Sequence, residues 1–174
     1  MENLNIIYLI GQLFGVVAVI LGFVSYQMKT SKGLKLAQMS TSVVFCIHYC
    51  LIGARSAFAM NIVSSVRNYV YSNSDKKIFS YKIYPILFAV ITAFMGFMSW
   101  EGAHSLFVIA GLVINTLAMS MKNPQSIRKS ILISSPLVII YDIFVKSFGG
   151  LVYEVVAIVS AIIGIIRYRK GIEE

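Results

Sequence analysis

Two carboxylates, Asp142 and Glu154, are the residues whose type and spacing point most directly to chemistry in this chain of 174 residues. Asp142 lies four residues before the turn Lys146–Gly150, and Glu154 lies four residues after it. If that turn joins two antiparallel helices, both carboxylates lie ~6 Å inside the same edge. Ionisable groups at membrane depth are costly and usually face a cavity, a partner or a proton pathway. The alternative is that one or both pair near the surface with a basic residue, namely Lys146, Arg55 or His104.

Two polar residues of the first half, His48 and Asn61, are placed in a comparable way around the earlier turn Arg55–Ser56. Counting along the helices puts both at ~7–8 Å from that edge. A histidine in a membrane is more often a hydrogen-bonded packing residue than a proton relay. Asn115, midway along a later apolar segment, is either a pocket group or an interhelical hydrogen-bonding residue, and the second outcome is the more common.

No motif of an enzyme or of a metal site accompanies these groups. Cys46 and Cys50, with His48 between them, fit no four-ligand zinc pattern. The sequence also contains no glycine-rich phosphate loop, no Gly-x-Ser-x-Gly nucleophile and no His-Glu-x-x-His pair. We therefore expect no enzymatic activity, no catalytic residue, no metal and no cofactor.

The elements that must position these residues are membrane helices. The chain is 58% hydrophobic and 13% charged, whereas a soluble domain is about half apolar and about a quarter charged. Its apolar blocks are about 16 to 20 residues long, which is enough to cross a hydrocarbon core of roughly 30 Å. The expected fold is an all-α, polytopic membrane protein with seven transmembrane helices. The predicted segments are Ile6–Tyr26, Leu36–Gly53, Ala57–Tyr71, Ile83–Trp100, Ser105–Met121, Ser130–Val145 and Leu151–Arg167.

The net charge of +8 is explained by topology. Of the 15 lysines and arginines, only Arg55 and Lys146 fall on one side of the predicted helices, and the other 13 fall on the opposite side. Cytoplasmic loops carry such an excess of positive charge. We expect the N-terminus outside and the C-terminus inside, and we expect no nucleic acid partner.

Three further expectations concern single segments. Arg67 lies about four residues before the inner end of the third segment, so its side chain is expected to extend to the inner surface. The fourth segment has no ionisable residue within its span and is expected to be a connector that faces lipid. The aromatic residues at segment ends are expected to form an interfacial belt, and they are Tyr71, Tyr81, Tyr84 and Trp100.

The two halves of the chain are expected to be a repeat with an offset of 93 residues. This offset matches Lys29 with Lys122, Lys35 with Arg128, Thr41-Ser42 with Ser134-Ser135, His48 with Tyr141 and Asn61 with Glu154. Identities are few, so loop positions and charge placement carry the interpretation. Three helices, one connector and three helices give a parallel repeat. The expected units are residues 1–72, a first three-helix bundle, 73–102, a linker with the connector, and 103–174, a second three-helix bundle.

This pattern resembles the SWEET and PQ-loop (MtN3-like) transporter superfamily, and its details are most similar to the YgjV-type bacterial inner-membrane proteins. The residues that carry the resemblance are Tyr26-Gln27-Met28-Lys29-Thr30-Ser31-Lys32-Gly33, His48-Tyr49, Gly53, Asn61 and Arg67. The architectural likeness covers nearly the whole chain. It implies a multi-pass protein of the bacterial cytoplasmic (inner) membrane.

The resemblance also implies a binding pocket. In the sugar-carrying members, each three-helix unit contributes an asparagine from its third helix and an aromatic residue from its second. These roles fall on Asn61 and on Phe45, or alternatively Tyr49, in the first unit. In the second unit they fall on Glu154 and Val138.

The sequence departs from the family pattern at several positions. Tyr26 stands where relatives have the proline of Pro-Gln, and Pro124-Gln125 is displaced into the predicted loop. Among the core segments, Pro136 alone could act as a hinge proline. The acidic second unit is also unlike a pocket for a neutral sugar.

The function expected from the sequence is transport or facilitated passage of a small polar solute by alternating access. The solute is either sugar-like or a cationic, amine-bearing molecule, with proton coupling as an option. The alternative is a non-transporting structural, regulatory or accessory membrane protein. The expected partners are the lipid bilayer and the solute, with self-association left open. The candidate solute-binding residues are Asn61, Glu154, Phe45, Tyr49, His48, Asp142 and Asn115.

Overall fold

The described part of the chain is all helical. The computed structural model describes residues 2–52, 55–79, 82–98, 100, 102–144 and 148–168, without the side chains of 2–5, 52, 55–57, 59, 148 and 149. These residues form seven α-helices and one short 3₁₀ helix, so the all-α prediction is confirmed for them. The helices are α1 (Glu2–Tyr26), α2 (Ser31–Ile52), α3 (Arg55–Ser72), η1 (Lys77–Phe79), α4 (Ile83–Met98), α5 (Ser105–Met119), α6 (Pro124–Phe144) and α7 (Phe148–Arg167).

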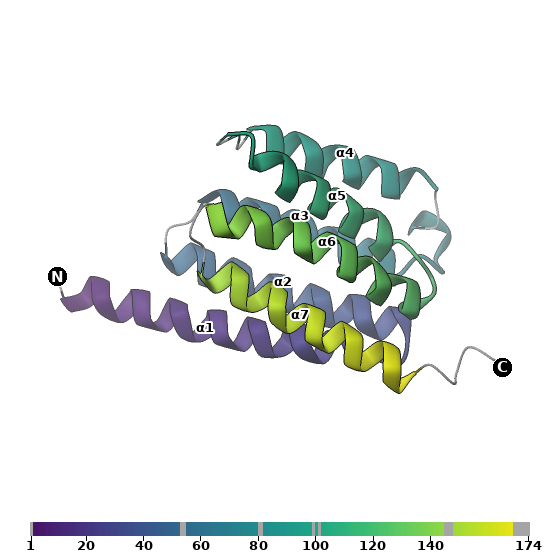
Figure 1. The fold of residues 1–174 in the computed structure, drawn as a ribbon, viewed down its shortest axis with the longest axis horizontal. Coiled ribbons are helices and arrows are strands. Elements are labelled where there is room, and N and C mark those ends of the chain that lie inside the picture. Colours follow the sequence, from purple (N-terminus) through teal and green to yellow (C-terminus); the bar gives the residue numbers. More distant parts are fainter. Residues whose placement is uncertain are drawn as a thin grey trace.

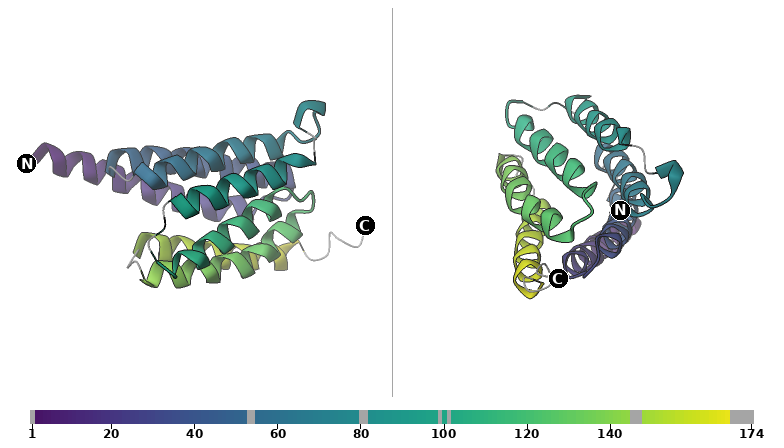
Figure 2. Two further views of the ribbon diagram at one scale, coloured as in Figure 1. Left: turned by 90° about the horizontal axis from the view of Figure 1, so that it is seen from above. Right: turned by 90° about the vertical axis from the view of Figure 1, so that its right-hand side faces the viewer.

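The seven α-helices form a ring in chain order (Figure 1). Each helix packs beside its neighbours in the sequence, because short connectors leave antiparallel neighbours adjacent. α4 packs mainly against α5 and less against α3, and α1 closes the ring against α7. The end-on view in Figure 2 shows this arrangement directly.

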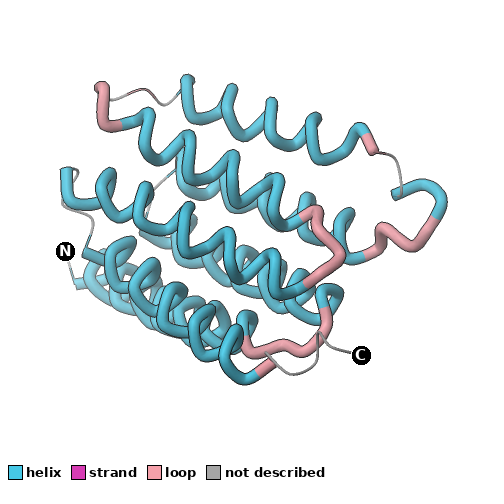
Figure 3. Tube along the Cα trace, turned by 45° about the vertical axis from the view of Figure 1, so that its right-hand side comes forward, coloured by secondary structure: helices cyan, strands magenta, loops and turns pink. Residues whose placement is uncertain are grey.

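One end of the ring carries most of the charge of the described residues, and we call it the basic end. It consists of the connectors 27–30, 73–79 and 120–123 with the adjoining helix ends (Figure 3). Lys29, Lys76 and Lys122 are exposed there. Lys32 and Asp75 form an exposed ion pair of 3.7 Å, an arrangement that contributes little to stability.

The outer surface of the ring is apolar, as a membrane protein requires. Within the described ranges, three stretches are long and apolar enough to cross a membrane, namely Ile6–Tyr26, Ser31–Leu51 and Gly150–Arg167, and α4 and α5 are shorter apolar helices. Large apolar side chains point outward, among them Leu13, Phe94 and Ile166. The N-terminal part of α1 extends beyond the neighbouring helices (Figure 1).

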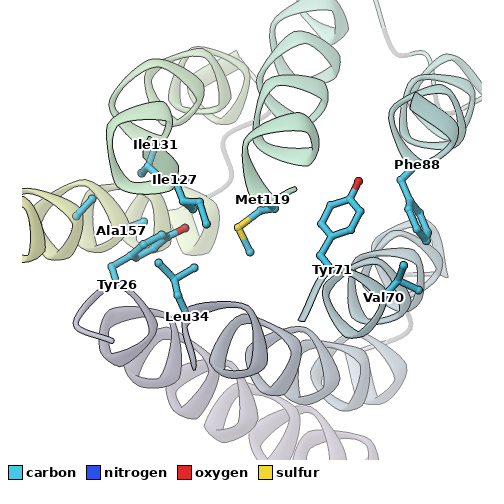
Figure 4. Close-up of a cluster of buried hydrophobic side chains, with 10 residues drawn as sticks. Tyr26, Leu34, Val70, Tyr71, Phe88, Met119, Ile127, Ile131 and Ala157 are labelled. Carbon is cyan, nitrogen blue, oxygen red and sulfur yellow. The ribbon is translucent and has the colours of Figure 1, made fainter. Parts of the chain in front are cut away.

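The main apolar cluster lies inside the ring near the basic end. Tyr26, Leu34, Met119 and Ile127 converge there from four helices (Figure 4). Tyr71 belongs to the same cluster, is 4% exposed, and packs edge-to-face on Phe88. Its predicted place in an interfacial belt is therefore wrong, because this face of α3 points into the ring.

Five helices (α1, α2, α3, α6 and α7) begin earlier than the hydropathy pattern predicts, and the difference is largest for α2 and α6. α2 begins at Ser31 rather than Leu36, and α6 begins at Pro124 rather than Ser130. The Gly33 amide donates to Thr30 Oγ1 at 3.1 Å, and the Gln125 amide donates to Asn123 Oδ1 at 2.8 Å. Such capping side chains start a helix through a polar first turn that a hydropathy window misses. The Pro124-Gln125 pair thus lies in a helix and not in a loop.

Some positions of the sequence interpretation lie outside the described residues. They are Gly53, Tyr81 and Lys146, together with the side chain of Arg55. His104, the third basic residue considered as a partner of the carboxylates, stacks against Phe144 with 5.7 Å between ring centroids.

Candidate functional site

A small polar cavity lies inside the ring between α1, α5, α6 and α7. Its volume is about 20 Å³, which is enough for about one water molecule. The polar side chains that line it are Tyr26, Asn115, Ser134, Ser135, Tyr153 and Glu154. The remaining lining is Gly111, Leu112, Ile131 and Val138.

Glu154 of α7 is the carboxyl group that lines this cavity. Its carboxylate accepts a hydrogen bond from the hydroxyl of Ser135 on α6. Ser135 is itself buried, as is the neighbouring Ser134. A carboxylate held by one hydroxyl keeps acceptor capacity on its remaining lone pairs, so Glu154 can bind a further donor group from the cavity.

Asn115 of α5 contributes a second acceptor. Its Oδ1 atom is buried and has no hydrogen-bond partner in the structure. Such an unsatisfied buried acceptor calls for a water molecule, an ion or a ligand group. The structure therefore brings together two of the seven candidate residues, Asn115 and Glu154, at one cavity.

Phe45 lies one layer outside this cavity. Its ring meets the Tyr153 ring edge-to-face with 5.3 Å between centroids. It also stacks on Tyr49 at 5.6 Å. Phe45 therefore supports a lining residue, while neither it nor Tyr49 lines the cavity itself.

His48 lies at the interface between α1 and α2. The ring is buried, and its Nδ1 atom is 2.7 Å from the Gly11 carbonyl oxygen. A methyl group on Gly15 would stand 3.1 Å from the same ring, so α1 passes close to it. This is the geometry of an interhelical packing residue.

Asn61 and the cysteines lie outside the cavity lining. Asn61 is half-buried on α3, and its carbonyl accepts from Ser65 Oγ at 2.9 Å. Cys46 and Cys50 are free thiols. In the described part of the chain no three His, Cys, Asp or Glu side chains gather as a metal site would require.

Asp142 is buried at the end of α6, close to the beginning of α7. A Cβ atom added to Gly150 would stand 2.5 Å from its Oδ2 atom. Asp142 interacts electrostatically with Glu154 and with Tyr49. The two carboxylates therefore lie near one another, although Asp142 does not line the cavity.

Arg67 is a functional candidate that the sequence interpretation missed. The side chain is only 6% exposed, and Nη1 donates to Thr116 Oγ1 across the ring at 2.7 Å. The expected extension to the inner surface is wrong. The Cα–Cβ bonds of a helix tilt toward its N-terminus, which for α3 is the end away from the surface that Arg67 was expected to reach. Thr116 then offers the guanidinium a partner inside the ring.

Two cations close the basic end in a reciprocal way, and we call this pair of contacts the latch. Lys35 Nζ, at the start of α2, donates to the Met121 carbonyl after α5 at 2.8 Å. Arg128, at the start of α6, donates through Nη2 to the Met28 carbonyl after α1. Arg128 Nε also donates to the Tyr26 carbonyl at 2.8 Å. Both cations are buried, and cations favour the carbonyl-rich C-terminal ends of helices.

The latch stands beside a second set of contacts that joins α1 to α7. Gln27 Nε2 donates to the Ser160 carbonyl at 2.8 Å, and Tyr168 OH donates to the Gln27 carbonyl at 2.8 Å. A methyl group on Gly164 would overlap the Tyr26 carbonyl and stand 2.6 Å from Arg128 Nε. The corner Tyr26–Thr30 is thus held from both neighbouring helices of the second half.

Comparison with known proteins identifies the family. No curated protein and no solved structure matches the chain. The sequence model of one family, described as bacterial inner membrane protein, matches residues 9–171. This match covers nearly the whole chain, and it agrees with the apolar outer surface of the ring. The chain belongs to the Imp-YgjV family of bacterial inner membrane proteins.

Proposed function

We propose that the protein transports a small polar solute across the bacterial inner membrane, or facilitates its passage. The observation that carries the proposal is the polar cavity inside a ring whose outer surface is apolar. Its lining includes a carboxylate (Glu154), an amide (Asn115), two serines and two tyrosines. Polar groups in a membrane interior are costly, and they are typical of solute and ion pathways.

The proposed architecture is a 3+1+3 repeat, in which α1–α3 and α5–α7 are two equivalent units and α4 connects them. The latch supports this proposal. Adding 93 to Lys35 and Met28 gives Arg128 and Met121, so the two contacts are exchanged between equivalent positions. The likeness to the SWEET and PQ-loop superfamily, and the N-out orientation, belong to the same proposal.

The proposed mechanism is alternating access between the two units. A cavity of about 20 Å³ is too small for a sugar or an amino acid, so this conformation is closed around its site. The latch joins the corner after α1 to the corner after α5. Opening toward the basic end therefore requires Lys35 and Arg128 to leave their carbonyl partners.

Uptake into proteoliposomes tests the proposal. Labelled sugars, amines and amino acids are offered to the wild type and to the variants Glu154→Gln, Asn115→Ala and Asn61→Ala. We expect Glu154→Gln and Asn115→Ala to reduce uptake by about tenfold or more, since each removes a charged or polar partner of the solute. Asp75→Asn, in the exposed linker, is the matched control. Wild-type uptake that survives in both cavity variants would remove this site from the pathway.

The variant Asn61→Ala tests whether the solute binds in the observed cavity or in the pocket that the resemblance implies. Asn61 occupies the family's asparagine position but does not line the cavity. Unchanged uptake in Asn61→Ala, together with loss in Asn115→Ala, is the result that the geometry favours. Loss in Asn61→Ala alone would favour the pocket implied by the resemblance.

The second candidate function is a non-transporting accessory or regulatory membrane protein. The small volume of the cavity favours it, because no solute larger than water fits in this conformation. Absence of uptake for every solute class, in either orientation of the gradient, is the outcome that would support it.

A further inference from the structure

The interior of the ring contains buried hydrogen-bond donors that have no acceptor. Arg67 forms no ion pair within the described part of the chain, and it donates hydrogen bonds to the neutral side chains of Thr116 and Asn68. Asn68 Nδ2 and Tyr71 OH are buried beside it without any hydrogen-bond partner. Asn68 is 1% exposed. We call Arg67, Asn68 and Tyr71 the donor pole.

These three side chains are neighbours. Arg67 Nε donates to Asn68 Oδ1 at 3.3 Å, which places the amide against the guanidinium. Tyr71 lies one helical turn after Arg67, on the same face, and interacts with it electrostatically. A guanidinium, an amide N–H and a phenol O–H together match the oxygens of an anion such as a carboxylate.

The cavity supplies the opposite chemistry. Glu154 and Asn115 Oδ1 are acceptors with capacity to bind a donor, and we call them the acceptor pole. Tyr26 and Tyr153 stand between the poles, since each interacts electrostatically with both Arg67 and Glu154. Figure 4 shows the Tyr26 and Tyr71 rings both inside the ring of helices.

A charge buried at membrane depth needs a partner of opposite charge or water. A neutral sugar would leave both Arg67 and Glu154 without one. A simple amine would leave Arg67 unpaired, and a simple acid would leave Glu154 unpaired. A solute with one positive and one negative group would satisfy both poles at once.

We propose that the transported solute is a zwitterion that carries a carboxylate and an ammonium group, as amino acids do. Its carboxylate binds the donor pole on α3, and its ammonium group binds the acceptor pole on α5 and α7. This inference rests on the proposed transport function and names its substrate class. It also gives the two halves of the molecule different tasks in recognising the same solute.

The test compares zwitterions with molecules that keep one of the two charged groups. Glycine, β-alanine, γ-aminobutyrate and L-leucine are offered to proteoliposomes of the full chain, beside isoamylamine, 4-methylpentanoate and glucose. The first three separate the charges by increasing distances, and the two truncated molecules correspond to leucine. We expect at least one zwitterion to be taken up with a half-saturating concentration about tenfold lower than either truncated molecule.

Charge-removing variants then show which pole binds the carboxylate of the solute and which binds its ammonium group. In Arg67→Gln, the advantage of the zwitterion over the amine should disappear, while Glu154→Gln should remove its advantage over the acid. Arg67→Lys keeps the positive charge. It is the control for a loss of zwitterion preference that is caused by misfolding and not by removal of the charge. Arg167→Gln, at an exposed position on α7, is the matched control and should keep wild-type selectivity. The thermal unfolding of each variant without solute reports its folding.

The outcomes distinguish this inference from the transport proposal. Uptake of glucose or of the amine that depends on Glu154, without preference for any zwitterion, would overturn the inference and leave the transport proposal intact. A zwitterion preference unchanged in a folded Arg67→Gln protein would also overturn it. If none of the molecules enters under any gradient, the inference falls together with the transport proposal.

Discussion

His48 shows how a polar residue in a membrane helix can serve packing. Its buried ring contacts the Gly11 carbonyl and lies against Gly15. We predict that His48→Ala lowers the free energy of unfolding by about 1–3 kcal/mol, since it removes an interhelical hydrogen bond and leaves a cavity. Thermal unfolding in detergent measures this loss.

The same variant should leave solute selectivity unchanged, because His48 does not line the cavity. Cys50→Ala, two residues further on and exposed, provides the control for helix α2. A selectivity change in a folded His48→Ala protein would instead place the imidazole on the solute pathway.

At this scale the sequence predicted polar residues better than it predicted their surroundings. Glu154 and Asn115 stand out because few polar side chains interrupt the apolar segments, and the structure places both at the cavity. Tyr26 and Tyr153 also line the cavity, yet tyrosines are common packing residues, so their type carries no such signal. The direction of Arg67 could have been derived from the tilt of the Cα–Cβ bond, but its partner Thr116 lies 49 residues away.

The latch is the element-scale feature that can be tested most directly. We predict that Lys35→Ala with Arg128→Ala frees the α1–α2 corner from the α5–α6 corner, since each cation loses its contacts to the opposite corner. The readout is a cysteine placed at Leu112, which lines the cavity, in a background without Cys46 and Cys50. This cysteine should react with a soluble maleimide several-fold faster in the double variant than in the protein that keeps Lys35 and Arg128.

The neighbouring residue gives a matched control. Lys129 follows Arg128 on α6 but is exposed, so Lys129→Ala should leave the labelling rate unchanged. Equal rates in the Lys129→Ala protein and the latch double variant would contradict a closing role for Lys35 and Arg128. Thermal unfolding of the double variant separates opening at one end from general destabilisation.

The boundaries of the elements were predictable where apolar residues continue to the helix end. α7 ends at Arg167, as the hydropathy pattern predicts. The starts of α2 and α6 were missed because Thr30 and Asn123 cap helices whose first turns are polar. Those polar turns contain Lys35 and Arg128, so the same omission concealed the latch. From the sequence, both residues serve only as charges that report topology and as matched positions of the expected repeat.

For the whole molecule, the charge distribution leads to a prediction of orientation. In a cysteine-free background, a cysteine at the exposed Lys76, at the basic end, should react with a membrane-impermeant maleimide only after the cells are permeabilised. A cysteine at the exposed Ala103, at the opposite end, should react in intact cells. The reverse pattern would invert the N-out orientation that the positive-inside rule predicts.

The closure of the ring between α1 and α7 could not be predicted from the sequence. Hydropathy gives the number of helices, and short connectors make neighbours adjacent. The contact between α1 and α7 depends on side chains 133 residues apart, such as Gln27 and Ser160. Polar pairs of this kind have no local pattern, so the sequence cannot tell a closed ring from two separate bundles.

The unequal lengths of the helices have a consequence for the surrounding bilayer. α1 has 25 residues, whereas α4 has 16 and α5 has 15, which corresponds to ~37 Å against ~24 Å and ~22 Å. A hydrocarbon core of roughly 30 Å must thin beside the short pair, while α1 must tilt or project beyond it. If α4 and α5 span the membrane as α1 does, we expect the bilayer to be thinner beside α4 and α5 than beside α1. Lipids with shorter acyl chains should gather along α4 and α5. The acyl-chain length of the surrounding lipids should therefore affect how well the bilayer matches these helices.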